Sequence, residues 1–181
     1  MAALRDIKRK ITAVQKTKQI TRAMNMVAAS KLKSAQMRME NFRPYAIRFM
    51  DVLKSLALRV DPKTHPLLAV REARKIRLIC MTSDRGLCGA FNSNILKLTE
   101  RFIRDKKADG LDVSLIPVGR KGRDYFRRKI TAVNAHADVF GRFDMSLAVR
   151  IGEDVIPSFI SEEYDELYLI YSEFNNVAIQ R

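Results

Sequence analysis

The chain has 181 residues, of which 47% are hydrophobic and 30% are charged, an ordinary mixture for a folded protein that excludes a disordered or fibrous chain. Its length allows one globular domain, or a small domain with an extended element, and excludes a large multidomain enzyme. The 34 Lys and Arg outnumber the 20 Asp and Glu, and the resulting net charge of +14 favours a polyanionic partner: nucleic acid, anionic lipid or an acidic protein surface.

The chain has no sequence signal for a membrane span or for secretion. No segment contains the 18 or so consecutive apolar residues of a spanning helix, and the N-terminus lacks the apolar core and cleavage site of a signal peptide. Cys80 and Cys88 are too few for a disulfide framework, and His65 and His136 give no zinc-binding spacing. We expect a chain that starts in solution in a reducing compartment and holds no structural metal or cofactor.

The positive charge is concentrated in the N-terminal third. Residues 1–60 contain 14 Lys or Arg and three acids, whereas residues 61–181 contain 20 basic and 17 acidic residues. No acid lies between Asp6 and Glu40. A solvated charged face is the ordinary explanation of such a run. The two regions differ enough to predict two domains, one at 1–60 and one at 61–181.

Residues 3–60 are predicted to form one long helix, because they contain no Gly, a single Pro44 and many good helix formers. A 3–4 alternation of mostly apolar residues runs from Leu4 to Val60, which is typical of a coiled coil. At 1.5 Å per residue the helix would be about 85 Å long and would project from the second domain. Its apolar seam needs a partner for stability. Pro44 should kink the helix or mark its passage onto the domain.

The seam is polar at Lys18, Thr21 and Asn25. These residues could set the register of the coiled coil, as a single buried Asn can. Alternatively, this stretch contacts another protein through its cationic side chains and the flexible Met24 and Met26. The sequence leaves both interpretations open.

The remaining 120 residues alternate between strands and helices, which predicts an α/β fold: a Rossmann-like domain with a mainly parallel, doubly wound sheet. The strands are expected at 75–82, 112–118 and 165–171, with a possible fourth at 130–133. The helices are expected from a cap at Asn92 or Ser93 to near Gly110, at 119–129 as a short basic helix, and at 147–161.

A nucleotide site at the first strand-to-helix turn is not supported. Gly86 and Gly89 lack the third glycine of a dinucleotide-binding loop, and no Gly-Lys-Ser/Thr follows to hold phosphate and magnesium. Asp84 and Arg85 are instead expected to engage each other or a neighbouring backbone in a turn. Cys88 is not in an interpretable relation to either histidine, so it is read as a buried or partner-facing thiol.

No catalytic residues are predicted, because the chain has no defensible carboxylate pair, triad or metal cluster. The Gly119-Arg-Lys-Gly122 element matches the GxxG loop of KH domains in letters only, since a strand precedes it here, whereas in KH domains it joins two helices.

Three long motifs carry a family resemblance. They are Ile-Thr-Arg-Ala-Met-Asn-Met-Val-Ala-Ala-Ser-Lys-Leu at 20–32, Arg-Pro-Tyr-Ala at 43–46 and Ser-Asp-Arg-Gly-Leu-Cys-Gly-Ala-Phe-Asn at 83–92. With these motifs the whole chain resembles the gamma subunit of the F-type ATP synthase, bacterial type. The resemblance implies a long N-terminal helix, an α/β domain and a long C-terminal helix that closes an antiparallel coiled coil. That last helix is lacking here, so we expect half of the shaft.

The resemblance implies a central-stalk rotor that does no chemistry itself and couples proton-driven rotation to conformational change in the catalytic beta subunits. The implied partners are the alpha, beta, epsilon and c subunits and no nucleic acid. The chain would be peripheral, attached through the c-ring at the cytoplasmic face of the bacterial inner membrane. Family knowledge places acidic loops of beta near the shaft, which suggests the contacts Lys16, Lys18, Gln19, Arg22, Met24, Val27, Arg85 and Cys88, and, toward epsilon or the c-ring, Arg120, Lys121 and Arg123.

The main alternative is a basic nucleic-acid-binding α/β protein. It would account for the charge and predicts a steep loss of affinity with salt. The basic stretch has no interleaved aromatic residues, and only Phe42, Tyr45 and Phe49 lie near its far end. A nucleotide-binding enzyme would account for the α/β domain, but the phosphate-binding motif is missing.

Overall fold

The computed structural model describes residues 2–61, 64–130, 133–141 and 145–176. It divides into two compact units, Met1–Asp61 and Pro62–Arg181, which are described separately. The first unit is built from one helix and the second from a sheet with helices, so the expected combination of a long helix and an α/β fold is confirmed.

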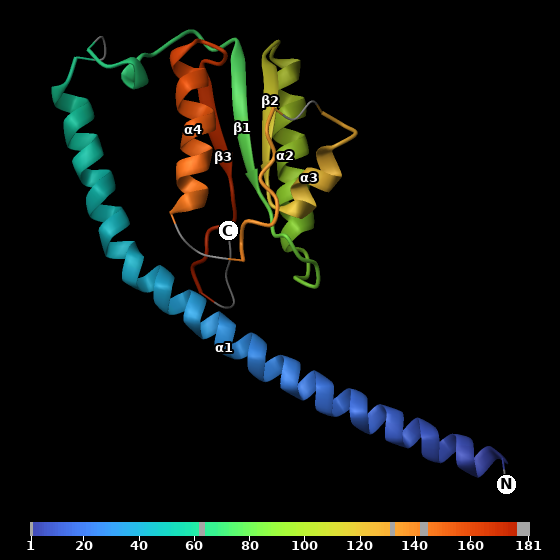
Figure 1. The fold of residues 1–181 in the computed structure, drawn as a ribbon. Helices are drawn as coiled ribbons and strands as arrows, with labels where there is room; N and C mark the ends of the chain where they lie inside the picture. The colour runs from blue at the N-terminus through green and yellow to red at the C-terminus, as the bar shows by residue number, and fades with distance from the viewer. Residues whose placement is uncertain (1, 62–63, 131–132, 142–144, 177–181) are drawn as a thin grey trace. The chain divides into compact units, whose positions relative to one another are not determined.

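The first unit is the helix α1, Ala2–Arg59, which has 58 residues. Pro44 lies inside it, and the helix continues on both sides of this residue. Figure 1 shows α1 as one curved helix. The seam is exposed: Ile11 has 51% of its surface accessible and Val14 has 68%. Thr21, one of the polar seam residues, donates its hydroxyl hydrogen bond to the Thr17 carbonyl of the same helix, at 2.9 Å.

The exposed seam predicts that the 181-residue chain either frays in this helix or covers the seam by associating with itself. Burying Ile and Val side chains against a second helix removes apolar surface from water, which is the main source of stability for such helices. We expect Ile11→Gln combined with Val14→Gln to raise the dissociation constant by at least about tenfold in sedimentation equilibrium, since each buried side chain contributes about 1.5–3 kcal/mol.

The matched control replaces two exposed apolar residues that lie off the seam, Ile20→Gln with Val27→Gln, and should leave the dissociation constant within about threefold of the parent. A monomeric parent chain in which residues 3–40 are helical and protected from hydrogen exchange would contradict the prediction.

The second unit contains a three-stranded parallel sheet with the order β2-β1-β3. The central strand β1, Lys75–Met81, pairs with β2, Asp112–Val118, from Lys75 opposite Asp112 to Met81 opposite Val118. On its other side β1 pairs with the edge strand β3, Glu166–Ile170. The predicted parallel pairing is therefore correct, and the strand bounds agree with the prediction to within one residue.

Helices cover both faces of this sheet (Figure 1). On one face α2, Phe91–Ala108, packs Ile95 and Ile103 against Leu78 of the central strand. On the other face Val155 of α4, Ser146–Ile160, belongs to a second cluster with Ile79. Because β1 is buried on both faces, its sequence is almost continuously apolar rather than alternating.

Two local predictions were wrong or fall partly outside the described residues. The residue before α2 is Ala90, and no side chain caps the helix, so the cap expected at Asn92 or Ser93 is not formed. Of the possible strand at 130–133, residues 131–132 lie outside the described part, and Ile130 and Val133 are not in a strand. A single parallel bridge joins His136 to Val118 instead.

The short helix α3, Arg120–Phe126, is shorter than the predicted 119–129. Gly119 precedes it with a φ of 96°, directly after β2, so the strand-to-helix context that excludes a KH loop is confirmed. A 3-10 turn at Pro66–Leu68 lies before β1. Within the described residues, no helix has both the length and the apolarity required to cross a membrane.

Candidate functional site

The six candidate contact residues on α1 are exposed and lie on two sides of the helix. At about 100° per residue, Lys18, Gln19 and Arg22 share one side, whereas Lys16, Met24 and Val27 lie on the opposite one. Lys18 and Arg22 also border a shallow, open groove together with Val14, Thr17, Thr21 and Asn25.

The positive charge of this part of α1 is not neutralised by any ion pair with the described residues. In the described residues, Lys16, Lys18 and Arg22 form no ion pair, and the helix has no acid between Asp6 and Glu40 that could supply one. Exposed cations without acidic neighbours attract a surface of opposite charge. The helix is therefore suited to contact with an acidic partner on more than one side.

The loop at 83–90 joins β1 to α2 and projects beyond the carboxyl ends of the strands (Figure 1). The side chain of Asn92, in the first turn of α2, forms hydrogen bonds to three residues of this loop. Its oxygen accepts the Ser83 N–H at 2.9 Å. Its amide nitrogen donates to the Arg85 carbonyl at 3.3 Å and to the Cys88 Sγ at 3.1 Å. Cys88 is exposed, which excludes the buried alternative and leaves the partner-facing one as a prediction.

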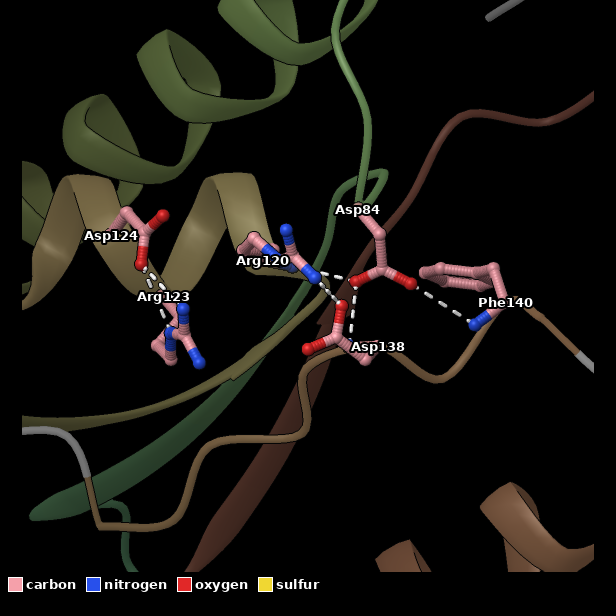
Figure 2. A network of polar contacts seen from close by, with 6 residues as sticks. All are labelled: Asp84, Arg120, Arg123, Asp124, Asp138 and Phe140. Carbon is pink, nitrogen blue, oxygen red and sulfur yellow. Dashed lines mark hydrogen bonds and ion pairs between the residues drawn. The ribbon is translucent and has the colours of Figure 1, made fainter.

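Asp84 connects this loop to two other segments (Figure 2). Its Oδ1 accepts the backbone N–H of Arg120 at 2.8 Å and of Asp138 at 2.9 Å, and its Oδ2 accepts the N–H of Phe140 at 3.1 Å. The Arg120 guanidinium also forms an ion pair with the Asp138 carboxylate. Of the two alternatives for Asp84, engagement of a neighbouring backbone is the correct one.

The electrostatics of Asp84 follow from these donors. Burial alone raises the pKa of Asp84, but the three backbone N–H groups and the nearby charge of Arg120 lower it further than burial raises it. The pKa therefore lies below its ordinary value, and the carboxyl group is ionised at neutral pH.

The three candidate cations of α3 have different surroundings. Arg120 pairs with Asp138, and Arg123 pairs with the adjacent Asp124 at 2.8 Å. Lys121 has no acid partner in the described residues, and a Cβ placed on Gly86 would lie 3.9 Å from its Cε. The structure thus brings Lys121 beside the 83–90 loop, although the sequence assigned α3 and the loop to different partners.

Sequence reasoning missed Asp138 and gave Asn92 a different role, that of a helix cap. The one local signal was a loop rich in Gly and Asp, which indicates a turn without indicating its partners. In the described residues, no group of three or more His, Cys, Asp or Glu is arranged to hold a metal ion. What the region presents is a hydrogen-bonded loop with cations at its surface.

Comparison with known proteins identifies the family. A family model described as ATP synthase matches residues 3–181. The chain belongs to this family. It is 66% identical over its whole length to the ATP synthase gamma chain of Syntrophus aciditrophicus, and 50% identical over 99% of its length to that of Nitratidesulfovibrio vulgaris strain Miyazaki F. In both cases the chain spans 62% of the relative's length.

A solved structure agrees with the family assignment. The structure of the central stalk and c-ring of the Tetrahymena thermophila mitochondrial ATP synthase contains a chain that matches 90% of this one, with a TM-score of 0.69 and 28% identity. The match covers 69% of that chain. The family resemblance seen in the three motifs is therefore confirmed, together with the combination of a long helix and a parallel α/β sheet.

Proposed function

We propose that the chain acts as the central-stalk rotor of an F-type ATP synthase and is not itself catalytic. The observation that carries the proposal is α1: 58 helical residues with an exposed apolar seam and no acid from residue 7 to residue 39. Such a helix suits a shaft that pairs with a second helix along its seam and turns against acidic surfaces. The relatives named as gamma chains support the same role.

The proposed mechanism is conformational coupling. A shaft that is asymmetric about its axis makes different contacts with otherwise equivalent catalytic beta subunits, and a difference in contact free energy is what shifts them between states. Rotation then transfers these differences from one subunit to the next. Because the candidate contacts of α1 lie on two sides of the helix, different subunits would meet different side chains.

The proposed placement follows the same logic. The candidate shaft contacts are those on α1 together with Arg85 and Cys88, and the α3 cations would face the epsilon subunit or the c-ring. The protein would be peripheral, at the cytoplasmic face of the bacterial inner membrane. Binding to nucleic acid is the alternative for a charge of +14, and the similarity to gamma chains across residues 3–181 favours the rotor.

The test replaces one shaft cation. The chain is co-expressed with the alpha, beta and epsilon subunits of its own source, and we expect a complex that hydrolyses ATP. Arg22→Glu should reduce turnover at least about fivefold, since reversing the charge costs on the order of 1 kcal/mol or more in the rotary state in which Arg22 meets the acidic surface, and this raises the barrier for passing through that state.

The matched control is Arg48→Glu, an exposed arginine on the same helix outside the acid-free stretch, which should retain most of the turnover. Equal activity of Arg22→Glu and the parent would contradict the contact assignment. Failure of the parent chain to co-assemble would contradict the proposed function.

A further inference from the structure

Leu87 has an unusual position at the tip of the 83–90 loop. Its relative accessibility is 104%, so its side chain packs against nothing in the described structure. Its φ is 62°, in the left-handed region that glycine and asparagine tolerate and that a leucine side chain disfavours. A leucine is thus unfavourable here for both solvation and backbone conformation, and the fold itself gives no reason for it.

The other non-glycine residues with positive φ differ from Leu87. Asp138 and Glu162, both at 60°, are polar, and each forms an ion pair, with Arg120 and Arg71 respectively. A residue whose type is unfavourable for its backbone conformation, and which no contact within the fold compensates, is typically found at a functional position. Leu87 alone of these three combines the conflict with an apolar side chain in water.

The loop holds Leu87 in a defined position. Asn92 bonds to Ser83 and to the Arg85 carbonyl, and Asp84 ties the base of the loop to α3 and to residues 138–140. A side chain presented in this way loses little conformational freedom on binding. One leucine side chain buries far less apolar surface than the myristoyl chain that itself gives only marginal membrane binding, whereas a shaped protein pocket can enclose the side chain. The occupant that fits is therefore a protein.

The charges beside Leu87 define the chemistry of that protein. In the described residues, the Arg85 guanidinium and the Lys121 ammonium have no acid partner, and the stem of Lys121 lies beside Gly86, next to Leu87 in the chain. An apolar side chain flanked by two free cations is complementary to an apolar pocket bordered by carboxylates.

We propose that Leu87 is the apolar anchor of the 83–90 loop and inserts into an apolar pocket, bordered by Asp or Glu, on a partner subunit of the complex. This inference rests on the proposed function and adds the kind of contact that the loop makes. Asp84 and Asn92 are positioning residues, since they act by holding the loop that carries Leu87.

The test is Leu87→Gly in the chain titrated against the assembled alpha, beta and epsilon subunits. Glycine removes the backbone conflict, so the thermal midpoint of the free chain should stay unchanged or rise by about 2 °C. Removal of the anchor should weaken binding by about tenfold or more, the equivalent of losing one buried leucine. Leu87→Met, which keeps an apolar side chain of similar volume, should bind within about threefold of the parent.

The matched control is Glu162→Gly, which relieves the same φ at another place and should leave binding unchanged. A photoreactive residue at position 87 should crosslink to a partner segment that contains apolar and acidic residues; crosslinking to this chain itself or to lipid would overturn the inference. If the parent binds tightly and Leu87→Gly binds equally well, the inference is overturned but the proposed function is not. If the parent does not bind at all, both the proposed function and the inference are overturned.

Discussion

Replacement of Gly119 by alanine should prevent the second unit from folding stably. Gly119 has a φ of 96°, and a Cβ at this position would lie 2.1 Å from the Thr82 carbonyl oxygen and 2.7 Å from its carbon. The backbone cannot easily move apart, because Thr82 N–H donates to Val118 at 2.8 Å and Gly119 N–H donates to His136 at 2.7 Å. We expect a loss of more than about 4 kcal/mol, a large part of the whole stability of a domain.

Urea unfolding followed by circular dichroism measures this loss, and two glycines of the same unit serve as controls. Among the described residues, none has an atom within 4 Å of a Cβ placed on Gly141, so Gly141→Ala should change the free energy of unfolding by less than about 0.5 kcal/mol. Gly89 is also unobstructed but has a φ of 57°, so Gly89→Ala should cost about 1 kcal/mol from backbone strain alone. If Gly119→Ala is as stable as Gly89→Ala, the backbone at Thr82 and Gly119 moves apart to make room for the methyl group, and the prediction is wrong.

The elements that the sequence predicted well are those with a long or strongly apolar signal. For α1 the signal extends over 58 residues without glycine, so composition and period agree along the whole helix. The apolar runs of β1 and β2 reflect burial on both faces of a parallel sheet, and their short length between turn residues distinguishes them from buried helices. Both strands were therefore predicted nearly to the residue.

The parts that were missed depend on contacts between residues far apart in the chain. Asp84 binds backbone groups 36, 54 and 56 residues away. Almost every residue type has a backbone N–H, so the sequence does not indicate which residue donates it. Asn92 was expected to cap its own helix by the usual local rule, but its amide satisfies the loop before the helix instead. Local rules cannot choose between two such partners, because the choice depends on how the loop is folded.

The clearest long-range effect should follow from Asp84→Ala. The substitution removes the carboxylate that accepts hydrogen bonds from three backbone N–H groups, those of Arg120, Asp138 and Phe140. A hydrogen bond to a charged group contributes about 1.5–3 kcal/mol. The three bonds to Asp84 are only partly buried and share one acceptor group, so their contributions do not simply add. We therefore expect the free energy of unfolding at pH 7, measured with urea, to fall by about 2–3 kcal/mol. Asp124→Ala removes a carboxylate that, among the described residues, pairs with the half-exposed Arg123 beside it, and should cost less than about 0.5 kcal/mol.

The pH dependence separates the charge of Asp84 from its shape. Because the pKa of Asp84 in the folded state is lowered, the stability that its carboxylate supplies is present above the ordinary value of about 3.8 and is lost as the pH falls through the folded-state pKa. The difference in unfolding free energy between the parent and Asp84→Ala should therefore be constant from pH 7 to about pH 5 and shrink below about pH 4. A difference that stayed constant into acid would mean that Asp84 acts by filling space, and the link between the 83–90 loop, α3 and residues 138–140 would then not depend on its charge.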